Sequence, residues 1–335
     1  SFIPTLPSQV DTAYRARTLA LGGNFLAMGS YPSPNHSGSS SRVLLFDVSN
    51  PNAPVYLRTI NMNGGSLRDL AINGPYLYGM GDTFSVVDLT NPSATIGTLF
   101  QNFNGTERAI AVAGGYAYVA EADSREDGLI RIYDVSVPSQ PKWLGDHAIY
   151  DATGIDFTDV LVYGSDYLIA ITPNRDVTVI DRRDVNLLVN VGLLDIPNFE
   201  AFRGRVDGNT LYLAGQEGGL AIVDLTNPTA PQVRLVNTQG FSRGVDSAGS
   251  MVALADGFTG VSFVDVSGAA PRIAGVQSTN GNAWDVVMHR SALYIANETG
   301  LSVIADLATP PTVKTSLITI TTNGAGTATV TGAAQ

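Results

Sequence analysis

The sequence has no cysteine, two lysines and three histidines in 335 residues. Without cysteine there is no disulfide, no thiolate metal site and no cysteine nucleophile. The histidines, His36, His147 and His289, are far apart along the chain, and none has a second histidine at the spacing of a metal site. These shortages remove several common kinds of catalytic and metal centre, and no catalytic residue is predicted.

Positive charge is also scarce, since Lys and Arg together number 19 against 30 Asp and Glu, for a formal net charge of −11. A nucleic-acid-binding surface needs clustered cations to neutralise phosphates, so this class of partner is excluded. The same charge argues against docking to an anionic membrane. No apolar run approaches the roughly 18 residues of a membrane span, so membrane insertion is not expected.

What the sequence does contain is glycine, threonine, serine and asparagine, with 35 glycines in all. This composition, with few lysines and an acidic balance, favours an extracellular or cell-surface protein of prokaryotic origin. Three segments match the glycosylation signal Asn-x-Ser/Thr, at Asn35, Asn104 and Asn297. They matter only in a eukaryotic secretory pathway.

An apolar run that ends in aspartate recurs along the chain. The final aspartates are separated by 41 to 47 residues and stand at Asp47, Asp88, Asp134, Asp181, Asp224, Asp265 and Asp306. A repeat of about 40–50 residues with several short strands in each unit is typical of a propeller blade. The sequence therefore predicts an all-β fold, a seven-bladed β-propeller of four-stranded antiparallel blades.

Each unit is predicted to hold an inner apolar strand, an aromatic strand, the run ending in aspartate, and an outer strand. In the second unit the first two are Leu67–Gly74 and Tyr76–Tyr78. In the seventh unit the outer strand is predicted over residues 313–317. The predicted blades are residues 14–64, 65–105, 106–154, 155–198, 199–240, 241–281 and 282–317, with strand-like extensions at 1–13 and 318–335.

The turn after each marker aspartate has a physical cause. A carboxylate in that position accepts backbone N–H groups one or two residues later. Two prolines then direct the chain away from helix, as Pro228 and Pro231 do after Asp224. The fourth unit reads Asp181-Arg182-Arg183-Asp184 and lacks both prolines, so its turn is predicted to differ.

These repeated segments resemble the LVIVD-repeat family of bacterial and archaeal surface proteins. The resemblance spans roughly Tyr14 to Thr315, is clearest in Gly219–Pro231 and Gly128–Pro141, and is weakest in the fourth unit. Membership would imply a β-propeller. It would bring no catalytic residue, since scaffold positions define the family.

Arginines recur at one position of the predicted inner strand, which lines the channel of a propeller. They are Arg17, Arg68, Arg108 and Arg243, with Trp284 in the seventh unit. One interpretation is a ligand site, because a ring of guanidinium groups at a channel mouth would bind an anion. The plainer interpretation, which the repeat favours, is that each arginine pairs with Asp69, Glu107, Asp246 or Asp285 and ties adjacent blades.

An acidic loop in the third unit contains Asp123, Glu126 and Asp127. Their oxygens suit Ca²⁺, but the spacing matches no established calcium loop, and a solvated acidic loop is the commoner case. No other cofactor or metal is predicted.

The two ends extend beyond the repeat. Residues 319–332 alternate threonine with small or apolar residues around Asn323-Gly324, which predicts a hairpin. This tail either completes the ring of its own chain, begins a further domain, or adds a strand to another copy. Apolar terminal residues are the candidates for such assembly: Phe2, Ile3, Leu6, Leu317, Ile318, Ile320 and Val330.

The function predicted from the sequence is that of a non-enzymatic extracellular structural or interaction protein. Its partner is a second copy, in a filament or surface layer, or another surface protein. The alternative is an adhesion or ligand-binding module that uses the loops and the arginines of the channel mouth. An enzyme, a propeller hydrolase or lyase, ranks third, because propellers can carry catalytic sites.

Overall fold

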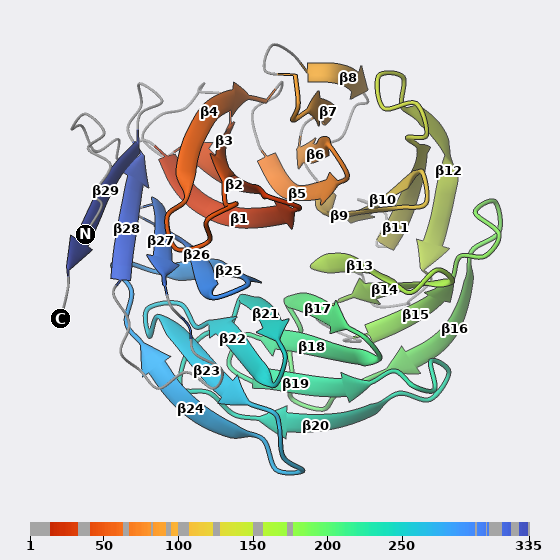
Figure 1. Ribbon diagram of the computed structural model, residues 1–335. Helices are drawn as coiled ribbons and strands as arrows, with labels where there is room; N and C mark the ends of the chain where they lie inside the picture. The colour runs from red at the N-terminus through yellow and green to blue at the C-terminus, as the bar shows by residue number, and fades with distance from the viewer. Residues whose placement is uncertain are drawn as a thin grey trace. The chain divides into compact units, whose positions relative to one another are not determined.

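The computed structural model describes residues 14–32, 41–62, 67–81, 83–91, 95–99, 107–122, 128–149, 157–172, 177–298, 300–305, 307, 317–322 and 328–333. These residues build seven antiparallel sheets (Figure 1). The chain divides into two compact units, a middle unit of residues 66–235 and a terminal unit that combines residues 1–65 with 236–335.

The middle unit holds blades 2 to 5. Blade 2 comprises β5 (Leu67–Asn73), β6 (Tyr76–Gly81), β7 (Phe84–Asp88) and β8 (Thr95–Leu99). Blade 3 comprises β9 (Glu107–Ala113), β10 (Tyr116–Ala122), β11 (Gly128–Asp134) and β12 (Lys142–Ile149). Blade 4 comprises β13 (Asp159–Tyr163), β14 (Tyr167–Ile171), β15 (Val177–Asp181) and β16 (Val189–Leu194). Blade 5 comprises β17 (Arg203–Asp207), β18 (Thr210–Gly215), β19 (Gly219–Asp224) and β20 (Gln232–Val236).

The terminal unit holds blades 1, 6 and 7. Blade 1 comprises β1 (Tyr14–Gly22), β2 (Phe25–Pro32), β3 (Arg42–Asp47) and β4 (Val55–Asn61). Blade 6 comprises β21 (Gly244–Ala248), β22 (Met251–Ala255), β23 (Val261–Asp265) and β24 (Arg272–Gln277). Blade 7 comprises β25 (Ala283–His289), β26 (Ala292–Asn297), β27 (Gly300–Ile304), β28 (Leu317–Thr322) and β29 (Ala328–Ala333).

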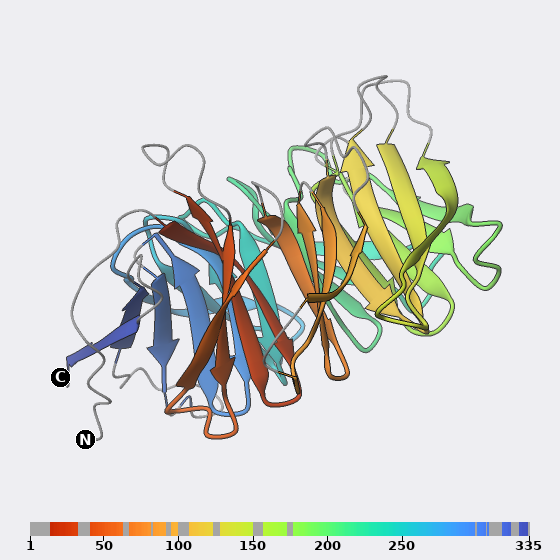
Figure 2. The same ribbon diagram turned by 90° about the horizontal axis from the view of Figure 1, so that it is seen from above.

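Each blade is a meander of consecutive strands, so every sheet is built from one continuous stretch of sequence. Figure 2 shows the strands within each blade lying side by side. The fold is a seven-bladed β-propeller with four strands in six blades and five in the last, which confirms the predicted architecture.

Burial follows the position of a strand within its blade. Every residue of β22, β26 and β27 is buried, whereas β16 and β24 contain only half-buried and exposed residues. Middle strands are covered on both faces, which requires continuous apolar runs rather than alternation. The marker runs recognised in the sequence are for this reason the buried third strands.

The apolar cores lie between neighbouring blades. In the terminal unit, Met28 and Phe46 of blade 1 pack with Tyr294 and Val303 of blade 7. The Tyr294 hydroxyl also donates to the carbonyl of Pro51 over 2.8 Å. The first and last blades of the chain therefore meet through side chains, while each keeps its own strands.

The marker aspartates make the predicted turn. In each of the six described copies the carboxylate accepts the backbone N–H two residues later, at 2.7–3.0 Å. These bonds favour the charged form and lower the pKa of several of the carboxyls, that of Asp265 to about 2. The seventh copy, Asp306, lies outside the described residues.

The turn of blade 4 does not differ as predicted. Asp181 accepts the N–H of Arg183, and the N–H of Leu187 is bonded to the carbonyl of Asp184 at 3.0 Å. The corresponding bond in blade 5 joins Ala230 N–H to the carbonyl of Asn227. Because carboxylate and backbone bonds define this turn, it forms without the prolines, and the prediction of another turn was wrong.

Outer strands carry a further regular feature. The pairing of the third and fourth strands is interrupted by a one-residue register shift in blades 1, 2, 3, 4 and 6. Gly192 lies beside this shift in blade 4, and a Cβ there would meet the Pro228 carbonyl of blade 5 at 2.1 Å. The glycine allows the outer strand to approach the turn of the next blade.

Replacing Gly192 with alanine is expected to lower the free energy of unfolding by about 1–3 kcal/mol, because two backbones must separate to admit the methyl group. Urea titration of the variant measures the loss. Gly268→Ala is the matched control, since its Cβ would meet nothing closer than the Ala270 carbonyl at 3.8 Å. Equal stability of the two variants would contradict this account of blade contact.

The last blade departs from the predicted strand boundaries. Its fourth strand is β28, Leu317–Thr322, which pairs with β27; of the predicted strand over 313–317, only Leu317 lies within the described residues. Residues 318–322, predicted to belong to an extension, therefore complete the blade. The predicted hairpin partner exists as β29, which pairs with β28 and lies at the outer edge of the sheet (Figures 1 and 2).

Candidate functional site

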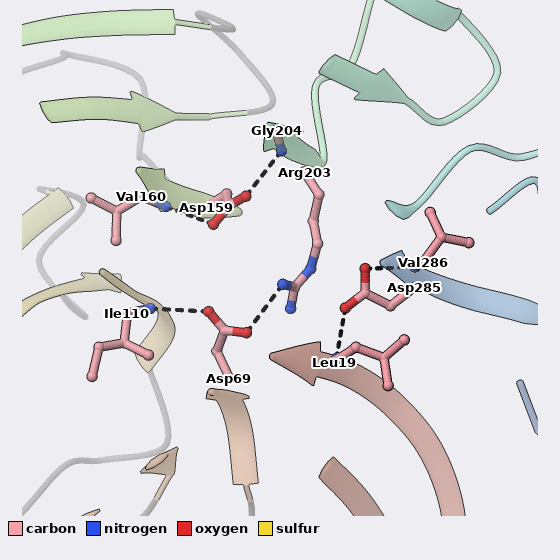
Figure 3. Close-up of polar contacts among 9 residues, drawn as sticks. All are labelled: Leu19, Asp69, Ile110, Asp159, Val160, Arg203, Gly204, Asp285 and Val286. Atoms are coloured by element: carbon pink, nitrogen blue, oxygen red, sulfur yellow. Dashed lines mark hydrogen bonds and ion pairs between the residues drawn. The ribbon is translucent and has the colours of Figure 1, made fainter. Parts of the chain in front are cut away.

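Four aspartates on the inner strands connect neighbouring blades through backbone amides. Their exposed fractions are 3–5%. In the terminal unit, Asp285 of blade 7 accepts the N–H of Leu19 in blade 1 at 2.8 Å, and that of Val286 at 2.9 Å (Figure 3). Asp246 of blade 6 accepts the N–H of Met288 in blade 7 at 2.7 Å.

The middle unit repeats this arrangement. Asp159 of blade 4 accepts the N–H of Gly204 in blade 5 at 2.9 Å, and Asp69 of blade 2 accepts that of Ile110 in blade 3 at 3.1 Å (Figure 3). The prediction placed Asp69, Asp246 and Asp285 as blade ties paired with arginines. Each of these three carboxylates accepts a main-chain N–H of the next blade, and Asp69 also pairs with an arginine, Arg203.

One arginine enters this network from the far side of the middle unit. Arg203 of blade 5 extends to Asp69 of blade 2, with Nη1 at 3.1 Å from Oδ1 (Figure 3). The two side chains are largely buried, with exposed fractions of 18% and 5%. The positive charge of Arg203 also acts on Asp159 and lowers the pKa of its carboxyl. This cation therefore acts on two buried carboxylates, Asp69 and Asp159.

Burial raises the pKa of Asp159 to about 7, because the charged form loses its hydration. The Arg203 guanidinium opposes this shift, and the negative charge of Asp69 adds to it. Arg203 thus offsets part of the effect of burial on the pKa of Asp159.

The predicted arginine position gives a second cluster, in the terminal unit. The Arg17 and Arg243 guanidinium carbons lie 4.2 Å and 3.7 Å from the centroid of one Trp284 ring. Arg243 also lies 4.9 Å from the ring of Phe241. We call Arg17, Trp284 and Arg243 the Arg–Trp–Arg stack. These are cation–π distances, a use of the arginines that the aligned position did not reveal.

Gly244 explains how the stack forms. Its Cβ, if present, would lie 2.7 Å from the Asp285 Cα and 3.0 Å from the Trp284 carbonyl. Without a side chain at this position, β21 and β25 approach closely enough for Arg243 to reach the indole. The other two predicted arginines belong to the middle unit, where Arg68 lies on β5 and Arg108 on β9.

One segment matches the Gly-x-Ser-x-Gly spacing of serine hydrolases, residues 240–244. Ser242 is fully buried and donates to Asp256, which also accepts from Thr238 at 3.3 Å. Burial raises the pKa of Asp256. The segment joins two blades of a β fold, so it lacks the strand-to-helix turn that exposes a nucleophilic serine. It is a structural polar cluster.

Several predicted positions cannot be placed. Phe2, Ile3, Leu6 and the acidic loop with Asp123, Glu126 and Asp127 lie outside the described residues. Within the described ranges, no group of three or more His, Cys, Asp or Glu could hold a metal ion. At the sequon of Asn297 the side chain is fully buried and donates to Ser302 at 2.7 Å, so this sequon is closed to glycosylation in the folded protein.

The comparisons with known proteins agree with the repeat seen in the sequence. The LVIVD repeat model matches residues 64–98, 104–147 and 205–236. The chain contains LVIVD repeats and folds as a seven-bladed β-propeller. The matched LVIVD repeats include the two segments in which the resemblance is clearest, and they leave out the fourth unit, in which it is weakest.

Solved structures share the fold at low identity. The computationally designed protein Ika8 is 12% identical, with a TM-score of 0.66 over 97% of this chain and 98% of that chain. The WD40 β-propeller domain of Doa1 is 11% identical, with a TM-score of 0.64 over 90% and 94%. Sqt1 of Saccharomyces cerevisiae is 11% identical, with a TM-score of 0.66 over 99% of each chain.

At such identities the likeness extends to the fold alone. Comparison with curated protein sequences finds no match. Among the described residues there is no helix long and apolar enough to cross a membrane.

Proposed function

We propose that this LVIVD-repeat propeller is a non-enzymatic extracellular scaffold whose copies associate through β29. The observation that carries the proposal is the fifth strand of blade 7, which extends the sheet beyond the four strands of the other blades. Among the described residues β29 is the last strand of its sheet, so the backbone N–H and C=O groups of one edge are not paired within that sheet. Such an edge is a template for a strand of another chain.

The sequence of β29 supports this role. Its residues, Ala-Thr-Val-Thr-Gly-Ala, include no charge and no proline, the usual protections of an edge strand. The pairing of β28 with β29 runs from Leu317–Ala333 to Thr322–Ala328 without a register shift. The outer strands of blades 1, 2, 3, 4 and 6 are instead interrupted by shifts, which discourage edge pairing.

The form of assembly depends on which edge β29 meets. Two β29 strands paired with each other would close a symmetric dimer. Pairing of β29 with a different edge of the next copy is heterologous and propagates as a filament. The filament is the proposed form, and its candidate assembly residues include Ile320 and Val330, which are partners in the β28–β29 register.

A chain that ends at Thr322 tests the proposal. It retains β28, the fourth strand of blade 7, and loses β29. We expect the full chain to sediment as large assemblies and the shortened chain as a monomer, with closely similar thermal unfolding. If the shortened chain assembles as the full chain does, β29 is not the contact. A shortened chain and a full chain that are both monomeric would direct the search to another surface protein as partner.

A further inference from the structure

The Arg–Trp–Arg stack has the features of a ligand-binding site, and association through β29 does not use it. Its side chains come from three successive blades of the terminal unit, and all three are half-buried, so solvent reaches them. Two of its donors, Nη1 of Arg243 and Nε1 of Trp284, are buried atoms with no hydrogen-bond partner among the described residues. Burying an N–H group without an acceptor costs free energy, and a bound species that accepts from these two donors would recover that cost.

The charge at the stack is positive. Arg15 is 3.8 Å from Glu298, so that carboxylate is already paired with a third arginine. Burial and then the neighbouring Arg17 lower the pKa of Arg243, while Glu298 acts in the opposite direction. Three arginines and one carboxylate thus lie at or beside the stack, in a chain whose formal net charge is −11.

The geometry also selects the kind of ligand. An indole that lies against the flat face of a guanidinium leaves the planar edge, with its N–H groups, for hydrogen bonding. That edge matches two oxygens of a carboxylate, sulfate or phosphate in a bidentate contact. Stacking also restricts the side chain, so less conformational freedom is lost when the ligand binds.

We infer that the Arg–Trp–Arg stack binds an oxyanion, held by the edge of Arg243 and by the neighbouring donors of Trp284 and Arg17. The oxyanion is either a small free ion or an acidic group on a larger molecule. This site is independent of β29, and the shortened chain that lacks β29 should retain it.

Tryptophan fluorescence provides a direct test, since the chain has two tryptophans. The second, Trp143, has an exposed fraction of 51% and donates to Asp146 at 3.0 Å in blade 3. In a Trp143→Phe protein the emission comes from Trp284 alone. Sodium sulfate, phosphate and acetate are titrated in turn at an ionic strength held constant with chloride. We expect a saturable change in emission with at least one of the three.

Variants assign the change to the stack. Arg243→Gln, in the Trp143→Phe background, is expected to raise the half-saturating concentration about tenfold or more, as loss of a charge-assisted hydrogen bond does. Arg183→Gln removes the same charge from an exposed turn of blade 4 and should titrate like the parent. Arg17→Gln gives a second variant if Arg243→Gln fails to fold by circular dichroism.

The remaining outcomes decide the question. If no anion gives a saturable signal in fluorescence or in calorimetry, or if both stack variants titrate like the parent, the inference is wrong. Where binding is found, acetate and oligogalacturonate are compared at equal carboxylate concentration. Equal affinity supports recognition of a free ion, and tighter binding of the oligomer supports an acidic polysaccharide as the source.

Discussion

Replacing Arg203 with methionine is expected to lower the free energy of unfolding by about 3–5 kcal/mol, the loss typical when one partner of a buried ion pair is removed. The arginine joins blade 5 to Asp69 of blade 2 and sits beside Asp159. Methionine retains much of the packing volume but leaves both carboxylates without their cation. Urea titration at pH 8, with the slope checked for constancy, measures the effect.

The pH dependence of this loss has a definite sign. Asp159 has a pKa raised to about 7 by burial, so its contribution to stability is present at low pH and decreases as pH rises through 7. Without Arg203 the charged form of Asp159 is disfavoured further, because the guanidinium is what opposes the effect of burial. The deficit of Arg203→Met should therefore be smaller at pH 5 than at pH 8. A deficit that is equal at the two pH values would contradict the role of the two carboxylates.

Arg183→Met is the matched control. Arg183 also pairs with an aspartate, Asp181, but its side chain has an exposed fraction of 66%. Exposed pairs contribute about 0–1 kcal/mol, so this variant should unfold close to the parent. A double-mutant cycle of Arg203→Met with Asp69→Asn then separates the pairwise coupling from the loss of packing.

Replacing Asp285 with alanine is expected to lower the free energy of unfolding by about 2–5 kcal/mol. The change leaves the buried N–H groups of Leu19 and Val286 without their acceptor. Because Leu19 is in blade 1 and Asp285 in blade 7, the loss falls on the contact between the first and last blades. Urea titration measures it, and hydrogen exchange should show reduced protection of the peptide around Leu19.

The control for this second variant is Asp224→Ala in blade 5. Asp224 accepts the N–H of Thr226 in an exposed turn, so its removal should cost only about 0.5–1.5 kcal/mol. If Asp224→Ala is as destabilising as Asp285→Ala, the marker turns rather than the inner-strand aspartates hold the blades together.

Local chemistry made much of the fold predictable. The marker aspartate forms its hydrogen bond within two residues, and the third strand is buried wherever the apolar run occurs, so both can be recognised in a short window. Blade 4 shows the limit of that reasoning. Its sequence lacks the prolines, yet Asp181 and Asp184 supply the same bonds, because the prolines accompany this turn and do not create it.

The site was predictable only in part. The repeated position of Arg17 and Arg243 could be found by aligning units, but their stacking on Trp284 depends on three blades at once. Arg203 was missed, since it is the only arginine at its place in the repeat and its partner is 134 residues away. The missed signal was a pair of aspartates, Asp69 and Asp159, at the same position of two inner strands, which require a cation or amides when buried.

The central claim, that this LVIVD-repeat propeller is an assembling scaffold, is tested most directly by negative-stain electron microscopy of the purified full chain beside its sedimentation profile. The account predicts regular assemblies in which propellers repeat along a filament, and their absence when the chain ends at Thr322. A uniform monomer with the 35.2 kDa mass of one chain, at every concentration tested, would contradict it.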